Sequence, residues 1–137
     1  LFSNLIMVGI SLITHFVTYP SFELIKSSIF PVFHKSYTNK MFLIVVPIMI
    51  LELISSILLV IFDVNDNYTE IALLITLIFI WFLTFFTIVP IHNKLAVNYN
   101  KDLNQKLIKY NGFRTTLWII KLILFIGFCD NLAANFH

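Results

Sequence analysis

Residues 41–62 read MFLIVVPIMILELISSILLVIF, an apolar run whose main interruptions are Pro47 and Glu52. A helix needs about 20 mainly apolar residues to cross the hydrocarbon core of a membrane, and this run is long enough. Three other stretches meet or approach that length, at residues 2–22, 71–90 and 113–128. The sequence therefore predicts an all-α fold, a four-transmembrane-helix bundle that forms a single domain over residues 1–137.

The composition of the whole chain agrees with this prediction. Of its 137 residues, 59% are hydrophobic and only 12% are charged, whereas soluble domains carry about 25% charged residues. The apolar runs are about twice as long as the strand of a membrane barrel, and they lack its alternation of polar and apolar residues. We therefore expect helices, and a lipid bilayer as their surroundings.

The basic residues predict the orientation of the helices. Residues 23–40 contain Lys26, Lys35 and Lys40, and residues 91–112 contain four more lysines, whereas residues 63–70 hold three acids and no Lys or Arg. Positive charge at membrane edges marks cytoplasmic loops. We therefore expect both basic loops to be cytoplasmic and both termini to lie outside. Charges with this role do not indicate a nucleic-acid partner.

The first basic loop also alternates apolar and polar residues. Phe30 and Phe33 occur among Lys26, His34 and Lys35, a mixture that suits a short helix lying in the membrane interface. We expect such an interfacial helix in the first cytoplasmic loop, with its regularity limited by Pro31. Residues 98–109 have a similar pattern and are expected to be partly helical.

Ionisable residues within the predicted spans are the first candidates for function. Such groups cost several kcal/mol in lipid unless they face a partner or water. Glu52 lies about 16 Å along its helix, near the midplane of the bilayer. Arg114 and Lys121, which share one helix face with Trp118, are the candidate cationic partners of Glu52 or of an anionic ligand.

A second group of polar residues falls in the cytoplasmic half. His15 and Tyr19 are four residues apart and share a helix face, and His92 lies at the membrane edge. The predicted ligand-binding residues are His15, Tyr19, Glu52, His92, Asn93, Asn111, Arg114 and Trp118. If the protein is an enzyme, the candidate catalytic residues are Glu52 as acid or base, Arg114 as the group that holds an anionic or enolate oxygen, and Tyr19.

The histidines also raise the question of a metal. Two or three histidines with a carboxylate form a ligand set for iron, zinc or copper, and paired histidines on different helices hold haem. The candidate metal ligands are His15, His34, Glu52 and His92. The alternative is that each histidine only forms a hydrogen bond to another helix, so a metal ion or haem remains one of two hypotheses.

Five short motifs carry a family resemblance. They are His15 with Tyr19-Pro20, Phe33-His34 with Thr38, Pro47-Ile48-Met49 with Glu52, Pro90-Ile91-His92 with Leu95, and Asn111 with Arg114-Thr115 and Trp118. In order and spacing they resemble an uncharacterised family of bacterial four-helix membrane proteins, which implies the bacterial inner membrane. More remotely they resemble the anthrone-oxygenase-like membrane proteins, which implies oxidation of an aromatic substrate.

The chain departs from the family pattern at two positions. Tyr37 stands where the family has a second histidine, and Gly112 stands where it has tryptophan. Two hypotheses for function follow from the residues and the resemblance. The first is a pocket in the cytoplasmic half that binds a ligand or cofactor, as in a membrane oxidoreductase. The alternative is a non-catalytic accessory subunit of a larger membrane complex, and the chain is also compatible with a homo-oligomer.

Overall fold

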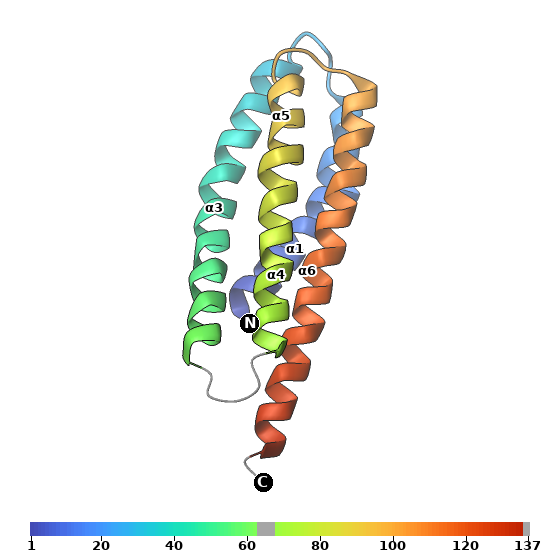
Figure 1. Ribbon diagram of the computed structural model, residues 1–137. Helices are drawn as coiled ribbons and strands as arrows, with labels where there is room; N and C mark the ends of the chain where they lie inside the picture. The colour runs from blue at the N-terminus through green and yellow to red at the C-terminus, as the bar shows by residue number, and fades with distance from the viewer. Residues whose placement is uncertain (63–67, 136–137) are drawn as a thin grey trace.

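Four long helices make up the computed structural model, which describes residues 1–62 and 68–135, the last six by their backbone alone (Figure 1). No strand occurs in the described residues. Each helix is long and apolar enough to cross a membrane, and the candidate spans are Phe2–Leu24, Phe30–Phe62, Tyr68–Leu95 and Lys101–Cys129. The predicted all-α four-helix fold is thereby confirmed. The predicted acidic turn at residues 63–67 lies outside the described residues.

Two of the spans are built from several helical segments. The first span consists of α1 (Phe2–Ile13), a π-turn (Thr14–Thr18), α2 (Tyr19–Ser21) and a 3₁₀ turn (Phe22–Leu24). The third consists of α4 (Tyr68–Leu83), a π-turn (Thr84–Ile88) and α5 (Val89–Leu95). The second and fourth spans are the single helices α3 (Phe30–Phe62) and α6 (Lys101–Asn135).

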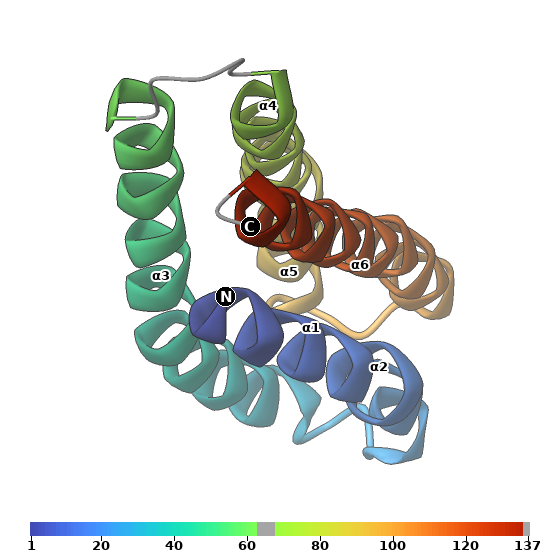
Figure 2. The same ribbon diagram turned by 90° about the horizontal axis from the view of Figure 1, so that it is seen from below.

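The four spans form a closed ring of neighbours. Helix α6 packs against α1 and α4, and α3 packs on the other sides of the same two helices. The order around the ring is therefore α1, α3, α4–α5 and α6, as the view along the bundle shows (Figure 2). The connections from α2 to α3 and from α5 to α6 lie at one end of the bundle, as the charge pattern predicts for two loops on one side.

Each π-turn ends two residues before a proline, Pro20 in the first span and Pro90 in the third. Proline lacks an N–H group and its ring clashes with the carbonyl group four residues earlier, so it normally breaks a helix. One extra residue in the turn absorbs this distortion. At the start of each π-turn a threonine hydroxyl also donates to the carbonyl four residues back, Thr14 to Ile10 at 2.6 Å and Thr84 to Ile80 at 2.7 Å. The first span thus continues past Pro20 to Leu24.

The interfacial helix predicted in the first loop is not a separate element among the described residues. Residues 30–40 form the first turns of α3 instead. Pro31 lies in the first turn of this helix, where a missing N–H breaks no hydrogen bond, so it does not limit the helix as we expected. The expected helix in residues 98–109 is confirmed from Lys101, and the Asn100 side chain accepts a hydrogen bond from the Leu103 N–H at 3.0 Å as its cap.

The interior contains one layer to which all four spans contribute. Met7 of α1, Met49 of α3, Leu77 and Ile80 of α4 and Trp118 of α6 are all buried and pack together. We call these five residues the apolar layer. Polar side chains are buried on both sides of it, with Arg114 toward the loop end of the bundle and Glu52 with Lys121 toward the other end. The outer surface carries many exposed apolar side chains, as expected of helices in lipid.

Candidate functional site

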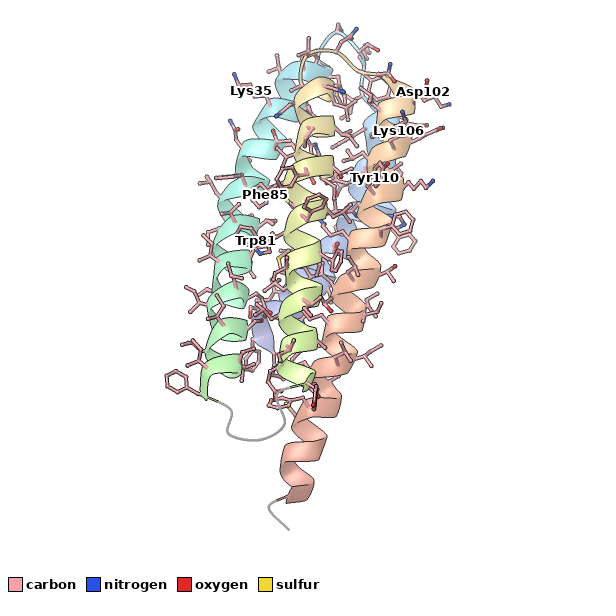
Figure 3. The ribbon with its side chains drawn as sticks, viewed as in Figure 1. Lys35, Trp81, Phe85, Asp102, Lys106 and Tyr110 are labelled. Atoms are coloured by element: carbon pink, nitrogen blue, oxygen red, sulfur yellow. The ribbon has the colours of Figure 1, made fainter. Side chains whose placement is uncertain are left out.

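A cleft of about 250 Å³ lies between α3 and α4–α5, on the loop side of the apolar layer. Its apolar wall comes mainly from α3, with Phe85 facing it from the π-turn of the third span (Figure 3). The polar residues that line it are Tyr19, Tyr37, Thr38, Asn39, Thr84, His92, Asn93 and Arg114. Of the predicted ligand-binding residues, the structure thus brings Tyr19, His92, Asn93 and Arg114 to one site.

Arg114 is the charged group of this cleft. It extends from α6, its side chain is only 5% exposed, and its Nε atom is buried without a hydrogen-bond partner. Among the described residues it forms neither a salt bridge nor a hydrogen bond. Its positive charge acts on Tyr19, Tyr37 and His92, which surround it. The cleft therefore contains a buried cation whose counter-charge the described chain does not supply.

A chain of hydrogen bonds leads from the cleft into the loop end of the bundle. The Tyr19 hydroxyl lies 3.0 Å from His92 Nε2, and His92 Nδ1 lies 3.0 Å from His34 Nε2. Tyr19 belongs to α2, His92 to α5 and His34 to α3, so the chain joins three spans. His34 is fully buried, with Phe30 stacked on its ring and Phe22 meeting it edge-on.

Glu52, predicted to belong to the same site, lies on the other side of the apolar layer. Its Oε2 atom is 2.6 Å from Lys121 Nζ, and both side chains are almost fully buried. The Ser3 hydroxyl donates to the second carboxylate oxygen. Of the two cations considered from the sequence, Lys121 is therefore the partner of Glu52. This pair connects α3 with α6 across the bundle, and it lies outside the cleft.

His15, in the π-turn of the first span, also lies apart from the cleft. Its ring packs against α6 at Gly112, where a Cβ atom would come within 3.0 Å of His15 Cε1. The absence of a side chain at position 112 is what admits the histidine ring. A large side chain at position 112 would occupy the volume of the His15 ring.

Two further predicted ligand-binding residues have packing roles. The Asn111 side chain donates to the Ser11 carbonyl at 3.2 Å, and the neighbouring Thr115 hydroxyl lies 2.8 Å from that of Ser11. These bonds join α6 to α1. Trp118 is fully buried in the apolar layer. Neither residue lines the cleft.

The four candidate metal ligands are not brought together. The described residues contain no group of three or more His, Cys, Asp or Glu side chains with the spacing of a metal site. Only His34 and His92 meet, and their nitrogen atoms are 3.0 Å apart in a hydrogen bond. Two imidazoles on opposite sides of one metal ion would hold these atoms about 4 Å apart. The arrangement therefore does not fit a haem whose iron is held between these two histidines.

The first turns of α3 contribute to the lining of the cleft, which we did not expect from the sequence. Tyr37, Thr38 and Asn39 line the cleft, but we assigned them to an interfacial loop. The signal was present, because a regular three- and four-residue spacing runs through this helix. Continued backwards from Glu52, it places one face of α3 at His34, Thr38, Met41, Val45, Met49 and Glu52.

Comparisons with protein-family models, with curated proteins and with solved structures found no match to this chain. The resemblance to uncharacterised bacterial membrane proteins and to the anthrone-oxygenase-like proteins therefore stays a prediction. Any function has to be inferred from the cleft itself, that is, from a buried arginine, a hydrogen-bonded chain of three rings and an apolar wall.

Proposed function

We propose that this protein binds a compact, lipid-soluble acid in the cleft between α3 and α4–α5. The acid is a phenol, a hydroxyquinone or a carboxylic acid, and its anionic oxygen pairs with Arg114. The observation that carries the proposal is the burial of Arg114 on the wall of the cleft without a counter-ion among the described residues. A buried charge is stable only when it is paired and hydrogen-bonded, and a bound anion would supply both.

The chemistry of the guanidinium group favours an oxygen anion. Arginine stays charged in proteins, and its planar fork of N–H donors matches two oxygen acceptors. Around it, the hydroxyl groups of Tyr19 and Tyr37 and the amide of Asn93 can both donate and accept hydrogen bonds. These neutral groups select the orientation of the ligand, while Arg114 selects its charge.

The size and lining of the cleft limit the ligand further. Pockets for drug-sized molecules measure roughly 300–1,000 Å³, so about 250 Å³ fits a molecule with one or two rings. The remaining walls are aliphatic and aromatic, for example Val45, Met49 and Phe85. Phe42 lies at the rim and is exposed on the lipid-facing surface of α3. The ligand therefore enters from the bilayer.

Binding of a coloured phenol tests this proposal. We would titrate the protein in lipid nanodiscs with 4-nitrophenol at mildly alkaline pH, where the probe is anionic, and with uncharged 4-nitroanisole. The wild type should bind the anion more tightly, and R114Q should lose roughly tenfold to hundredfold in affinity for it, the range for a hydrogen bond to a charged group. K106Q removes a charge from the exposed face of the same helix and serves as the control.

Three results would contradict the proposal. The first is anion binding no greater than that of empty nanodiscs, and the second is equal affinity in R114Q and wild type. The third is a second protein that co-purifies at fixed stoichiometry and places a carboxylate against Arg114. That result would favour the accessory-subunit hypothesis, because the partner chain would then neutralise the cation.

We also propose a location and an orientation for the chain. The loops of residues 23–40 and 91–112 face the cytoplasm of a bacterium across its inner membrane, because they carry most of the lysines. Single cysteines introduced at Lys35 and Lys101, in a C129S background, would test this. A membrane-impermeant maleimide should label neither position in intact cells and both positions after lysis. Labelling of these cysteines in intact cells would mean that the orientation is opposite to the one proposed.

A further inference from the structure

The chain of three hydrogen-bonded rings extends beyond the cleft to His34, and ligand binding alone does not explain this far end. The chain runs from Tyr19, on the cleft, through His92 to His34. At the far end, His34 Nδ1 is buried without a hydrogen-bond partner among the described residues, and the side chain is 0% exposed. Leaving a buried ring nitrogen without a hydrogen-bond partner costs free energy, so its presence calls for an explanation.

The geometry permits only a limited set of proton positions. Each neutral imidazole has one nitrogen that donates and one that accepts. When the Tyr19 hydroxyl donates to His92 Nε2, His92 must donate from Nδ1 to His34 Nε2, and His34 then carries its proton on Nδ1. Every group in this state is neutral, and the Tyr19 oxygen is free to accept a hydrogen bond from a hydroxyl group in the cleft.

We propose that Tyr19, His92 and His34 form a proton relay that ionises the hydroxyl group of the bound ligand. This inference rests on the proposed function. The ligand O–H bond breaks and its proton moves to the Tyr19 oxygen. The Tyr19 proton moves to His92 Nε2, and the His92 Nδ1 proton moves to His34 Nε2. The products are a ligand anion beside Arg114 and a His34 imidazolium, so protons and charge balance.

Burial disfavours a positive charge on either ring, but the far ring is the better of the two as the final position of the proton. The charge of Arg114 acts on His92, which makes a second positive charge there unfavourable. His34 is one ring further from the cleft, and its ring stacks on Phe30 with centroids 5.2 Å apart. An aromatic face at this distance attracts a cation. The relay thus separates the proton from the anion that Arg114 holds.

The relay assigns different roles to its members. Tyr19 is the catalytic acid–base group, because its hydroxyl contacts the ligand. His92 and His34 act through Tyr19, and their mutual hydrogen bond fixes which nitrogen carries each proton. The Asn104 side chain holds the Tyr19 backbone carbonyl at 3.1 Å and so fixes the position of this residue against α6.

The test uses 4-nitrophenol at mildly acidic pH, where the free probe is a neutral phenol. Two signals are followed in nanodiscs: the visible absorbance of the bound phenolate, and the ¹⁵N resonances of the histidine side chains. In the wild type, phenolate absorbance and a His34 imidazolium signal should rise together as the probe binds. Adding 4-nitroanisole, which has no proton to give, should produce neither signal.

Two variants with the same chemical change separate the relay from packing. Y19F removes the hydroxyl that contacts the ligand, so the probe should still bind at Arg114 while the His34 imidazolium signal is lost. Y110F removes a hydroxyl from α6 outside the cleft (Figure 3) and should keep both signals. H34Q removes the last ring of the chain and should leave Arg114-dependent binding in place.

The outcomes distinguish this inference from the proposed function. If the wild type binds the probe as phenolate while His34 stays neutral, or if Y19F still protonates His34, the relay is wrong and the binding proposal stands. If the wild type shows no saturable binding in either pH range, the proposed function fails and the relay fails with it.

Discussion

Helix α6 carries two buried cations, and their surroundings differ in kind. Arg114 and Lys121 are seven residues apart, about two turns, so they lie on the same helix face. Lys121 meets Glu52 at 2.6 Å, with both side chains almost fully buried. Arg114 faces a cleft and has no carboxylate partner in the described part of the chain. The first cation is paired within the fold, whereas the second has no counter-charge among the described residues.

The comparison shows why a buried charge alone does not identify a functional site. From the sequence, both cations were possible partners for Glu52 and both were possible ligand-binding groups. What separates them is the volume beside each one: the space next to Lys121 is filled by Glu52 and Ser3, whereas the space next to Arg114 is a cavity of about 250 Å³.

The largest expected effect is on the paired cation. Replacing Lys121 with methionine leaves Glu52 buried without its partner, and such a loss costs about 3–5 kcal/mol of stability. We expect K121M to lower the free energy of unfolding by that amount in detergent titrations, and the double variant E52L/K121M to recover most of it. If K121M alone unfolds like the wild type, the pair is not a structural element of the bundle.

Replacing Arg114 with methionine should change the free energy of unfolding in the opposite direction. R114M replaces a buried guanidinium, unpaired within the described chain, with an apolar side chain of similar length, so in the absence of ligand it should stabilise the protein by about 1–2 kcal/mol. The same unfolding titration measures this change. Destabilisation of R114M comparable to that of K121M would mean that Arg114 is held by a partner, and the contrast between the two sites would disappear.

A carboxylate introduced into the cleft should provide Arg114 with a counter-charge, as Glu52 does for Lys121. Asn93 lines the cleft, and N93D introduces an anion that competes with the ligand for Arg114. We expect affinity for 4-nitrophenolate to fall by roughly threefold to tenfold, the range of a partly exposed ion pair. N93Q keeps the amide and is the matched control. Unchanged binding in N93D would place the anion elsewhere in the bundle.

The smallest effect is expected where α1 and α6 are in close contact. In G112A the new methyl group meets His15 at 3.0 Å, which is unfavourable, while alanine favours the helix over glycine by about 1 kcal/mol. These terms offset each other, so the change in unfolding free energy should stay within about 1 kcal/mol. Because His15 lies outside the cleft, probe binding should not change. Loss of probe binding in G112A would indicate that His15 belongs to the binding site.

The fold was predictable in class because each span is a long apolar run that only a helix can satisfy in lipid. The starts of α3 and α6 were less predictable, because the lysines and other polar residues in those turns resemble loop residues. Pro31 also reads as a helix breaker until its place in the first turn is known.

The site was predictable in part. Tyr19, His92, Asn93 and Arg114 were identified because polar residues at the membrane edge are few. The separation of these residues from Glu52 was not predictable. Pairing between helices depends on the relative depth of α3 and α6, and the sequence of neither helix determines that depth. The bond between His34 and His92 likewise depends on how the loop end of α3 meets α5.

The apolar layer gives the cleft a defined relation to the membrane voltage. Met7, Met49, Leu77, Ile80 and Trp118 form an apolar section of the bundle. Such a section has a low dielectric constant, and the potential difference across a membrane falls mainly over it. An anion in the cleft therefore stays close to the potential of the loop end. Although moving one charge across a full membrane takes about 2.3 kcal/mol per 100 mV, ligand binding at Arg114 should depend only weakly on voltage.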